Sequence, residues 1–392
     1  MNAKNWWAGA AIAGLTMLAF VLMMGAPAVQ AEELKIGAVG TLSGGGTEWG
    51  KALQRGLTVA IDEINEAGGV KVGNKTYTLK MIMYDDQYTA QGGTTAAIRL
   101  INVDGVKFII GPVGSPPALG VVAVANPAKV IVLSDGYSGK ILTPESKYNF
   151  RIQIPTEYFA PGMAKWLAKT YPKAKKVGFI SPNDAVGQTL VPVQIEAYKA
   201  AGIETVSDEK FDRGMADFTP LITRMVARGA DIFELDGDAP GDAGLMVKQA
   251  RQMGYKGIII QTGGPGTDEI MRVAGKLADD FLTYDLFDPS DPSGAEFVKR
   301  YRAQFTGPIN GLSPIYYNGM KILAEALRRA GSLDTDKVKG ELEKLDGFQT
   351  LFGPVRWDGK ERYGVRHQLV HDFFVTQVKD GKAKPIARVS HE

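Results

Sequence analysis

The sequence predicts an α/β protein that contains two doubly wound parallel-sheet lobes, one after the other along the chain. Short apolar segments alternate with amphipathic helical segments, as in parallel sheets covered by helices on both faces. Turns rich in glycine and proline separate these segments. The chain has 392 residues, 45% of them hydrophobic, whereas single cores stop growing near ~250–300 residues, so we expect two domains.

The first sheet is expected to begin at Leu34. Its strands are short and apolar, and its helices repeat apolar residues at intervals of three and four. We expect strands over 34–39, 77–84, 108–110 and 130–133, and helices over 49–66, 89–102 and up to 125.

The second sheet is expected after a short strand-like segment over 150–154. Its elements alternate in the same way, and the tail from Gly353 contains a hairpin-like turn and then many β-forming residues. We expect strands over 176–180, 203–211, 232–235, 257–261 and 368–378, and helices over 160–170, 190–201, 218–227 and 241–253.

The N-terminal segment is typical of a secretory signal. Lys4 is the only charge before Glu32, and an uncharged apolar run ends in a small-residue pattern that predicts cleavage after Ala31. A retained membrane anchor is the alternative, because the run exceeds the roughly 20 residues that cross a bilayer. Pro27 and the small residues at the end favour cleavage.

Composition excludes several classes of partner. The chain has no cysteine, which excludes disulfides and a lipid-modified cysteine after the signal. Removal of the signal leaves 44 basic and 43 acidic residues, so charge gives no reason to expect binding to nucleic acid or to an anionic membrane.

Ligands of open α/β sheets bind beyond the carboxyl ends of the strands. The loops of interest are therefore 41–49, 111–117, 134–138, 181–187, 236–242 and 262–267.

The first of these loops has the spacing of a phosphate-binding loop from Gly45 to Lys51. Ala52 stands where a hydroxyl would hold magnesium, and Glu48 and Trp49 would crowd and repel phosphates. Trp49 also occupies the third glycine position of a dinucleotide-binding motif. Neither motif is complete, and we expect no cofactor.

His367 and His371 have the spacing of a helical zinc pair, but their segment alternates like a strand and lacks a nearby third ligand. Ser43, Ser115 and Ser134 lie in suitable loops for a nucleophile, yet no histidine precedes His367. We therefore expect no catalytic residue and no metal site.

Several motifs together resemble the periplasmic binding proteins for branched-chain amino acids and related solutes, which have a type I binding fold and serve ATP-driven importers. The resemblance extends from Leu34 to about Ala387. Its motifs are Ile36-Gly37, Leu42-Ser43-Gly44, Gly50 with Gly56, 62–69, Tyr84-Asp85-Asp86, 106–111, Asn183-Asp184, 249–254 and 353–358.

The resemblance implies that the chain crosses between its lobes three times, near Arg151, Thr283 and Arg356. After a signal over 1–31, lobe one would comprise 32–152 and 284–355, and lobe two 153–283 and 356–392. The ligand would bind in the cleft between the lobes, which closes by a hinge motion.

In lobe one, the family's site residues match Trp49, Ser115, Gly136 and Ser138. Hydroxyl groups and free backbone N–H groups there would bind a carboxylate, and the indole would cover an apolar group. In the alternative interpretation, Trp49 packs inside lobe one and the serines cap helices. The adjacent residues Gly114, Pro116 and Tyr137 belong to the same expected site.

In lobe two, the sequence departs from the family. Val186 replaces a usual tyrosine, and Gly264 lies where an acid should bind the ligand's ammonium group; Asp268 is the nearest carboxylate. Asp236 and Asp238 are the remaining candidates, because an ammonium group buried without a partner is costly. Alternatively they cap the helix that starts near 241, an interpretation we favour for Asp236 and leave open for Asp238.

The function expected is that of a periplasmic solute-binding protein, a monomer that delivers a small carboxylate-bearing ligand to the membrane permease subunits of an ABC importer. The ligand would be a branched-chain or hydrophobic amino acid, or an aromatic or other acid without an amine, which the missing acid in lobe two slightly favours. The alternatives are a ligand-sensing receptor module of the same fold, which would need a fused membrane or enzymatic segment, and an α/β enzyme.

Overall fold

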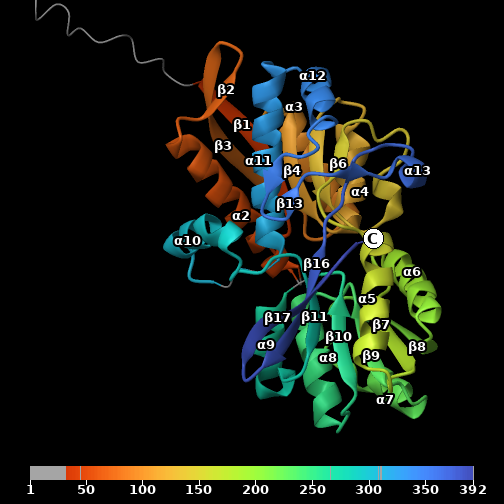
Figure 1. Cartoon of the computed structure of the whole chain (residues 1–392). Helices are drawn as coiled ribbons and strands as arrows, with labels where there is room; N and C mark the ends of the chain where they lie inside the picture. Colours follow the sequence, from red (N-terminus) through yellow and green to blue (C-terminus); the bar gives the residue numbers. More distant parts are fainter. Residues whose placement is uncertain (1–31, 45, 265, 308, 310, 392) are drawn as a thin grey trace, which may run out of the picture.

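The computed structural model describes residues 32–44, 46–264, 266–307, 309 and 311–391. The expected signal over 1–31 lies outside these residues. Two sheets, each covered by helices, form two lobes stacked one above the other (Figure 1). Among the described residues, no helix combines the length and apolar character needed to cross a bilayer.

Lobe one is built on an eight-stranded sheet with the order β14-β15-β6-β5-β4-β1-β3-β2. Its central strands run parallel, whereas β2 and β14 pair antiparallel at the two edges. The strands are β1 (Glu32–Gly40), β2 (Val70–Val72), β3 (Lys75–Asp85), β4 (Phe108–Val113), β5 (Ile131–Asp135), β6 (Asn149–Arg151), β14 (Trp357–Asp358) and β15 (Gln368–Leu369).

Helices cover both faces of this sheet because neighbouring strand residues point to opposite sides. Ile110 and Leu133 pack in the cluster that contains α2 and α11, while Ile109 and Val132 pack with α3 and α4. The helices of lobe one are α2 (Thr47–Glu66), α3 (Ala90–Asn102), α4 (Ser115–Ala125), α10 (Ala295–Gln304), α11 (Leu312–Ala330), α12 (Thr335–Leu342) and the short α13 (Lys360–Tyr363). A small hairpin of β12 (Gln349–Thr350) and β13 (Gly353–Pro354) adjoins them.

Lobe two is built on a seven-stranded sheet with the order β17-β16-β11-β10-β9-β7-β8. Its strands from β7 to β11 are parallel, and β16 and β17 extend one edge as an antiparallel hairpin. The strands are β7 (Lys176–Pro182), β8 (Glu204–Phe211), β9 (Ile232–Asp236), β10 (Ile258–Thr262), β11 (Leu282–Asp285), β16 (Phe373–Lys379) and β17 (Lys382–Val389). The helices are α5 (Thr156–Thr170), α6 (Gly187–Ala200), α7 (Thr219–Ala227), α8 (Pro240–Gln252) and α9 (Thr267–Ala274).

The chain passes between the lobes three times. The first passage follows β6, which ends at Arg151, and the second follows β11, which ends at Asp285. The third lies between β15 and β16, not near Arg356 as the resemblance implies, because β15 pairs with β6 and carries 356–369 into the sheet of lobe one. Strands of two residues give no alternating pattern, so the sequence could not show this pairing.

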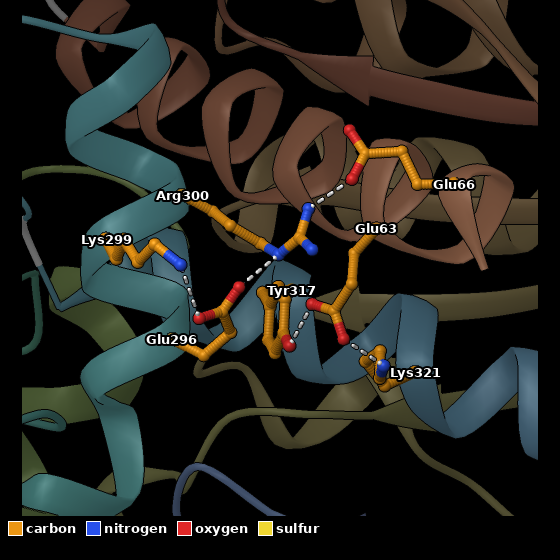
Figure 2. A network of polar contacts seen from close by, with 7 residues as sticks. All are labelled: Glu63, Glu66, Glu296, Lys299, Arg300, Tyr317 and Lys321. Atoms are coloured by element: carbon orange, nitrogen blue, oxygen red, sulfur yellow. Dashed lines mark hydrogen bonds and ion pairs between the residues drawn. The ribbon is translucent and has the colours of Figure 1, made fainter.

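Helix α10 follows the second passage and is linked to α2 of lobe one by an ion pair (Figure 2). Arg300 contacts Glu66 of α2 at 2.7 Å and Glu296 at 2.8 Å. Glu63 of α2 accepts hydrogen bonds from Tyr317 and Lys321 of α11 at 2.6 and 2.8 Å. Single exposed pairs contribute little to stability; here Arg300 links α10 to α2, and Glu63 links α2 to α11.

Candidate functional site

A small cavity lies between the lobes at the carboxyl ends of both sets of parallel strands. Its volume is about 20 Å³, which is enough for about one water molecule, so a solute can enter only when the lobes separate. It is lined by Trp49, Tyr88, Val113, Gly114, Asp135, Tyr137, Gln153, Val186, Gly263, Gly264 and Leu312.

Five predicted site residues line this cavity, namely Trp49, Gly114, Tyr137, Val186 and Gly264. Trp49 lies in the first turn of α2 and contacts lobe two, since a Cβ built on Gly264 would be 2.9 Å from the Trp49 ring. The Trp49 side chain is 3% exposed, and its Nε1 has no hydrogen-bond partner among the described residues. The indole therefore reaches the boundary between the lobes and offers a free donor there.

The predicted serines hold a loop of lobe one in place. Ser115 Oγ accepts a hydrogen bond from the Ser138 N–H at 2.9 Å, and Ser138 Oγ accepts one from the Lys140 N–H at 3.3 Å. Arg151 Nη1 donates to the carbonyls of Gly136 and Ser138, each at 3.1 Å. Ser115, Pro116, Gly136 and Ser138 lie beside the cavity but do not line it.

Neither Asp236 nor Asp238 caps a helix. Helix α8 begins after Ala239 without a side-chain cap, and neither carboxylate has a hydrogen-bond partner among the described residues. Asp238 is fully buried next to the cavity, where its carbonyl would lie 3.4 Å from a Cβ built on Gly264. The two capping interpretations are therefore wrong, and both acids are fully buried.

Burial raises the pKa of Asp238 well above its usual range, and the positive charge of Arg213 opposes this increase. Asp242 and Asp236 add negative charge that raises the same pKa further. The Asp238 side chain is absent from the cavity lining, so the structure does not place it against a ligand.

Asp135 is a cavity-lining acid that the sequence analysis missed. It ends β5 and accepts a hydrogen bond from Tyr316 Oη at 3.0 Å. Gln153 joins it to Tyr137, whose hydroxyl donates to the Gln153 amide oxygen at 2.6 Å while the amide nitrogen faces Asp135. Burial raises the pKa of Asp135 to about 7, although Tyr316 and Arg151 lower it. Its position at the carboxyl end of an apolar strand was the signal that could have identified it.

Tyr88 is the second missed residue. Its backbone has a φ of 57°, and the Asp86 carboxylate fixes this turn by accepting hydrogen bonds from the Tyr88 N–H at 2.8 Å and from Thr41 Oγ1 at 2.7 Å. The Tyr88 ring lies 5.4 Å from the Trp49 ring on one side. It lies 4.7 Å from the Arg213 guanidinium of lobe two, so a cation–π contact joins the lobes.

His367 and His371 do not share one helix face. His367 bonds to the Asn149 carbonyl and to Glu343, each at 2.9 Å, next to lobe-one strand β6. His371 lies in the third passage and bonds to the Asp372 carbonyl at 2.7 Å. The two side chains therefore make separate contacts, one within lobe one and one in the third passage.

The fold and the interlobe cavity together define a binding protein of two lobes, and comparison of sequences identifies its family. The chain belongs to the periplasmic binding protein family, whose sequence profile matches residues 33–383. This confirms the resemblance inferred from the motifs.

Curated relatives are named as binding proteins. An amino acid binding protein of Pseudomonas aeruginosa is 27% identical over 364 residues, which cover 92% of this chain and 95% of the relative. A leucine-specific-binding protein of Salmonella typhimurium is 28% identical over 352 residues, covering 89% of this chain and 92% of the relative.

Solved structures confirm the type I fold. A leucine binding protein from Thermotoga maritima has a TM-score of 0.81 at 22% identity, covering 91% of this chain and 99% of that one. A solute binding protein from R. palustris in complex with benzoate has a TM-score of 0.80 at 18% identity, covering 91% and 96%. The same fold thus occurs in proteins with chemically different ligands.

Proposed function

We propose that this protein captures a small amino acid in the interlobe cavity and delivers it to the membrane permease subunits of an ABC importer. One observation carries the choice of ligand: a buried carboxylate, Asp135, lines the cavity from lobe one. The names of the curated relatives, which are amino acid and leucine binders, support the same ligand class.

The charge of Asp135 favours a ligand with an amine. Two unit charges about 4 Å apart interact by about 4 kcal/mol at the effective dielectric of a protein surface. That energy is favourable for a ligand ammonium group and unfavourable for a second carboxylate. The Nε1–H of Trp49, which has no partner among the described residues, is available to donate a hydrogen bond to the ligand carboxylate.

An aromatic acid is the second candidate, because the rings of Trp49, Tyr88 and Tyr137 all line the cavity. Such rings stack well on a flat ligand. Its carboxylate would bind in the cavity only if Asp135 held a proton, which its raised pKa of about 7 allows in mildly acidic solution.

Calorimetry can separate the two ligand classes by matched pairs: leucine with isocaproate, and phenylalanine with hydrocinnamate, with benzoate as a further acid. We expect binding of a member that carries an amine. Asp135→Asn should weaken it by about 2–5 kcal/mol, as loss of one partner of a buried charge pair does.

Asp238→Asn is the matched control, because it removes another buried acid that lies outside the cavity lining. A large loss of affinity in Asp238→Asn, with no loss in Asp135→Asn, would show that the ligand's ammonium group binds to lobe two. Binding of benzoate that improves in Asp135→Asn would contradict the amino acid proposal.

Export to the periplasm with cleavage after Ala31 and a monomeric state complete the proposal. Intact-mass analysis of exported protein should give a chain that starts at Glu32. A mass that still includes Met1 to Ala31 would contradict cleavage, and a stable dimer in size-exclusion chromatography with light scattering would contradict the monomer.

A further inference from the structure

A second and larger cavity spans the boundary between the lobes and shares no lining residue with the interlobe cavity. Its volume is about 440 Å³, within the range of small-molecule sites. Lobe two contributes α9, the end of β11 and the β16–β17 hairpin, and the chain after β11 contributes the rest, including Arg302 of α10. Figure 1 shows α10 on the lobe-one side and α9 and β17 on the lobe-two side.

Two residues that line this cavity carry a buried hydroxyl group that has no hydrogen-bond partner among the described residues. Thr267 is 5% exposed and Thr376 is 3% exposed, and neither Oγ1 has a hydrogen-bond partner among the described residues. Burying a hydroxyl without a hydrogen bond is unfavourable, so a ligand that pairs with these groups would recover that free energy.

Charged groups of both signs line the same cavity. Burial raises the pKa of Asp268, and no described cation or donor offsets this effect. Asp285 accepts hydrogen bonds from the backbone N–H groups of Leu286, at 2.8 Å, and Phe287. Arg302 and Lys382 line the cavity as exposed cations and form no ion pair with a described residue. Two acids and two cations therefore lie around one space without pairing with each other.

We propose that this cavity, defined by Asp268, Asp285, Thr267 and Thr376 with Arg302 and Lys382, binds a small zwitterion that carries an ammonium group and a carboxylate. A simple anion would be repelled by the two acids, and a simple cation by Arg302 and Lys382. A zwitterion complements both the two acids and the two cations. Its ammonium group can donate hydrogen bonds to the threonine hydroxyls and the carboxylates.

The position of the cavity couples such a ligand to the hinge. Helix α10 is bound to lobe one through Arg300 and its partners (Figure 2), whereas Asp268 and Thr376 belong to lobe two. Thr267 also follows the loop whose Gly263 and Gly264 line the interlobe cavity. A ligand bound here contacts both lobes, so it favours one hinge angle, and by linkage each ligand changes the affinity for the other.

Glycine is a suitable probe, because it is the smallest amino acid that carries both an ammonium group and a carboxylate. Calorimetry on the mature protein should show saturable glycine binding that persists in Trp49→Ala, which disables the interlobe cavity. Asp268→Asn should weaken it at least about tenfold, as loss of a charge-assisted hydrogen bond does. Thr376→Val, of similar shape, should also weaken it, and the exposed control Asp279→Asn should not.

Methylammonium and acetate test the ligand class, since each carries one of the two charged groups, and both should bind more weakly than glycine. The absence of saturable glycine binding would overturn the inference. So would binding that is lost in Trp49→Ala, or binding that is unchanged in both Asp268→Asn and Thr376→Val. Because the Trp49 variant isolates this cavity, failure here is distinguishable from failure of the proposed function of the interlobe cavity.

Discussion

The two lobes present unlike surfaces to the cavity between them. Lobe one supplies aromatic rings and the carboxylate of Asp135, whereas lobe two supplies the small or apolar residues Val186, Gly263 and Gly264. The acids of lobe two, Glu234, Asp236 and Asp238, are fully buried but lie outside the cavity lining.

This difference suggests different roles for the two lobes: lobe one would recognise the ligand, and lobe two would cover it. In lobe one the cavity acid is fixed by hydrogen bonds with Tyr316 and Gln153. In lobe two a loop whose glycines have no side chain lies against Trp49. The absence of side chains allows close contact when the lobes meet.

The largest expected effect is on stability against pH, because both lobes bury carboxyl groups. Burial raises the pKa of Asp135 in lobe one, and of Asp236 and Asp285 at lobe two, from 3.8 to about 7. Between these values the folded protein binds more protons than the unfolded chain, so the stability present in acid is lost as pH rises through about 7. His371, whose pKa burial lowers to about 4, acts in the opposite direction over part of this range.

We therefore expect the ligand-free protein to unfold at a lower temperature at about pH 8 than at about pH 5. Asp135→Asn and Asp236→Asn should each reduce the dependence of the melting temperature on pH. The size of each reduction gives the contribution of that lobe. A melting temperature that increases steadily over this range in calorimetric scans would show that these acids are ionised in the folded protein.

A smaller effect, on stability and on ligand binding, is expected from Gly264→Ala. This variant tests whether the loop of lobe two needs a residue without a side chain at this position. The backbone φ of Gly264 is 151°, and an added Cβ would be 2.9 Å from the Trp49 ring. The backbone conformation should lower stability by about 1–3 kcal/mol, and the overlap should weaken binding by a further ~1–3 kcal/mol.

Trp49→Ala should remove the overlap but not the backbone strain, so a double-mutant cycle on the free energy of unfolding distinguishes the two causes. If Gly264→Ala binds ligand as tightly as the wild type, the loop does not contact Trp49 in the closed protein.

The smallest effect is expected from the contact that joins the lobes. Tyr88→Leu removes the ring that lies under Arg213, and a cation–π contact of this kind contributes about 0.5–2 kcal/mol. The variant should favour the open form, so small-angle scattering with saturating ligand should give a larger radius of gyration than for the wild type. Tyr88→Phe keeps the ring and is the control; equal loss in both variants would assign the effect to the hydroxyl instead.

The sequence predicted much of the fold and part of the site. The strands ending at Gly40 and Asp85 and the helices after them had clear apolar periods, and Trp49 and Gly264 were identified from motifs. Ser115 and Ser138 are predicted to bind a ligand, and in the structure their hydroxyl groups accept hydrogen bonds from the backbone of one loop. The sequence could not predict these partners, because a hydroxyl after a strand can serve either purpose.

By itself, the sequence determined the alternation of strands and helices, the two lobes and the family, because these depend on local periodicity and on motifs close in the chain. Only the tertiary structure decided which lobe receives 356–369, whether Asp238 caps a helix, and that Asp135 lines the cavity beside Tyr88. Each of these depends on contacts between segments far apart in the sequence. Burial and hydrogen bonding across such contacts, which no local pattern encodes, determine whether a carboxylate is a cap, a structural group or a binding group.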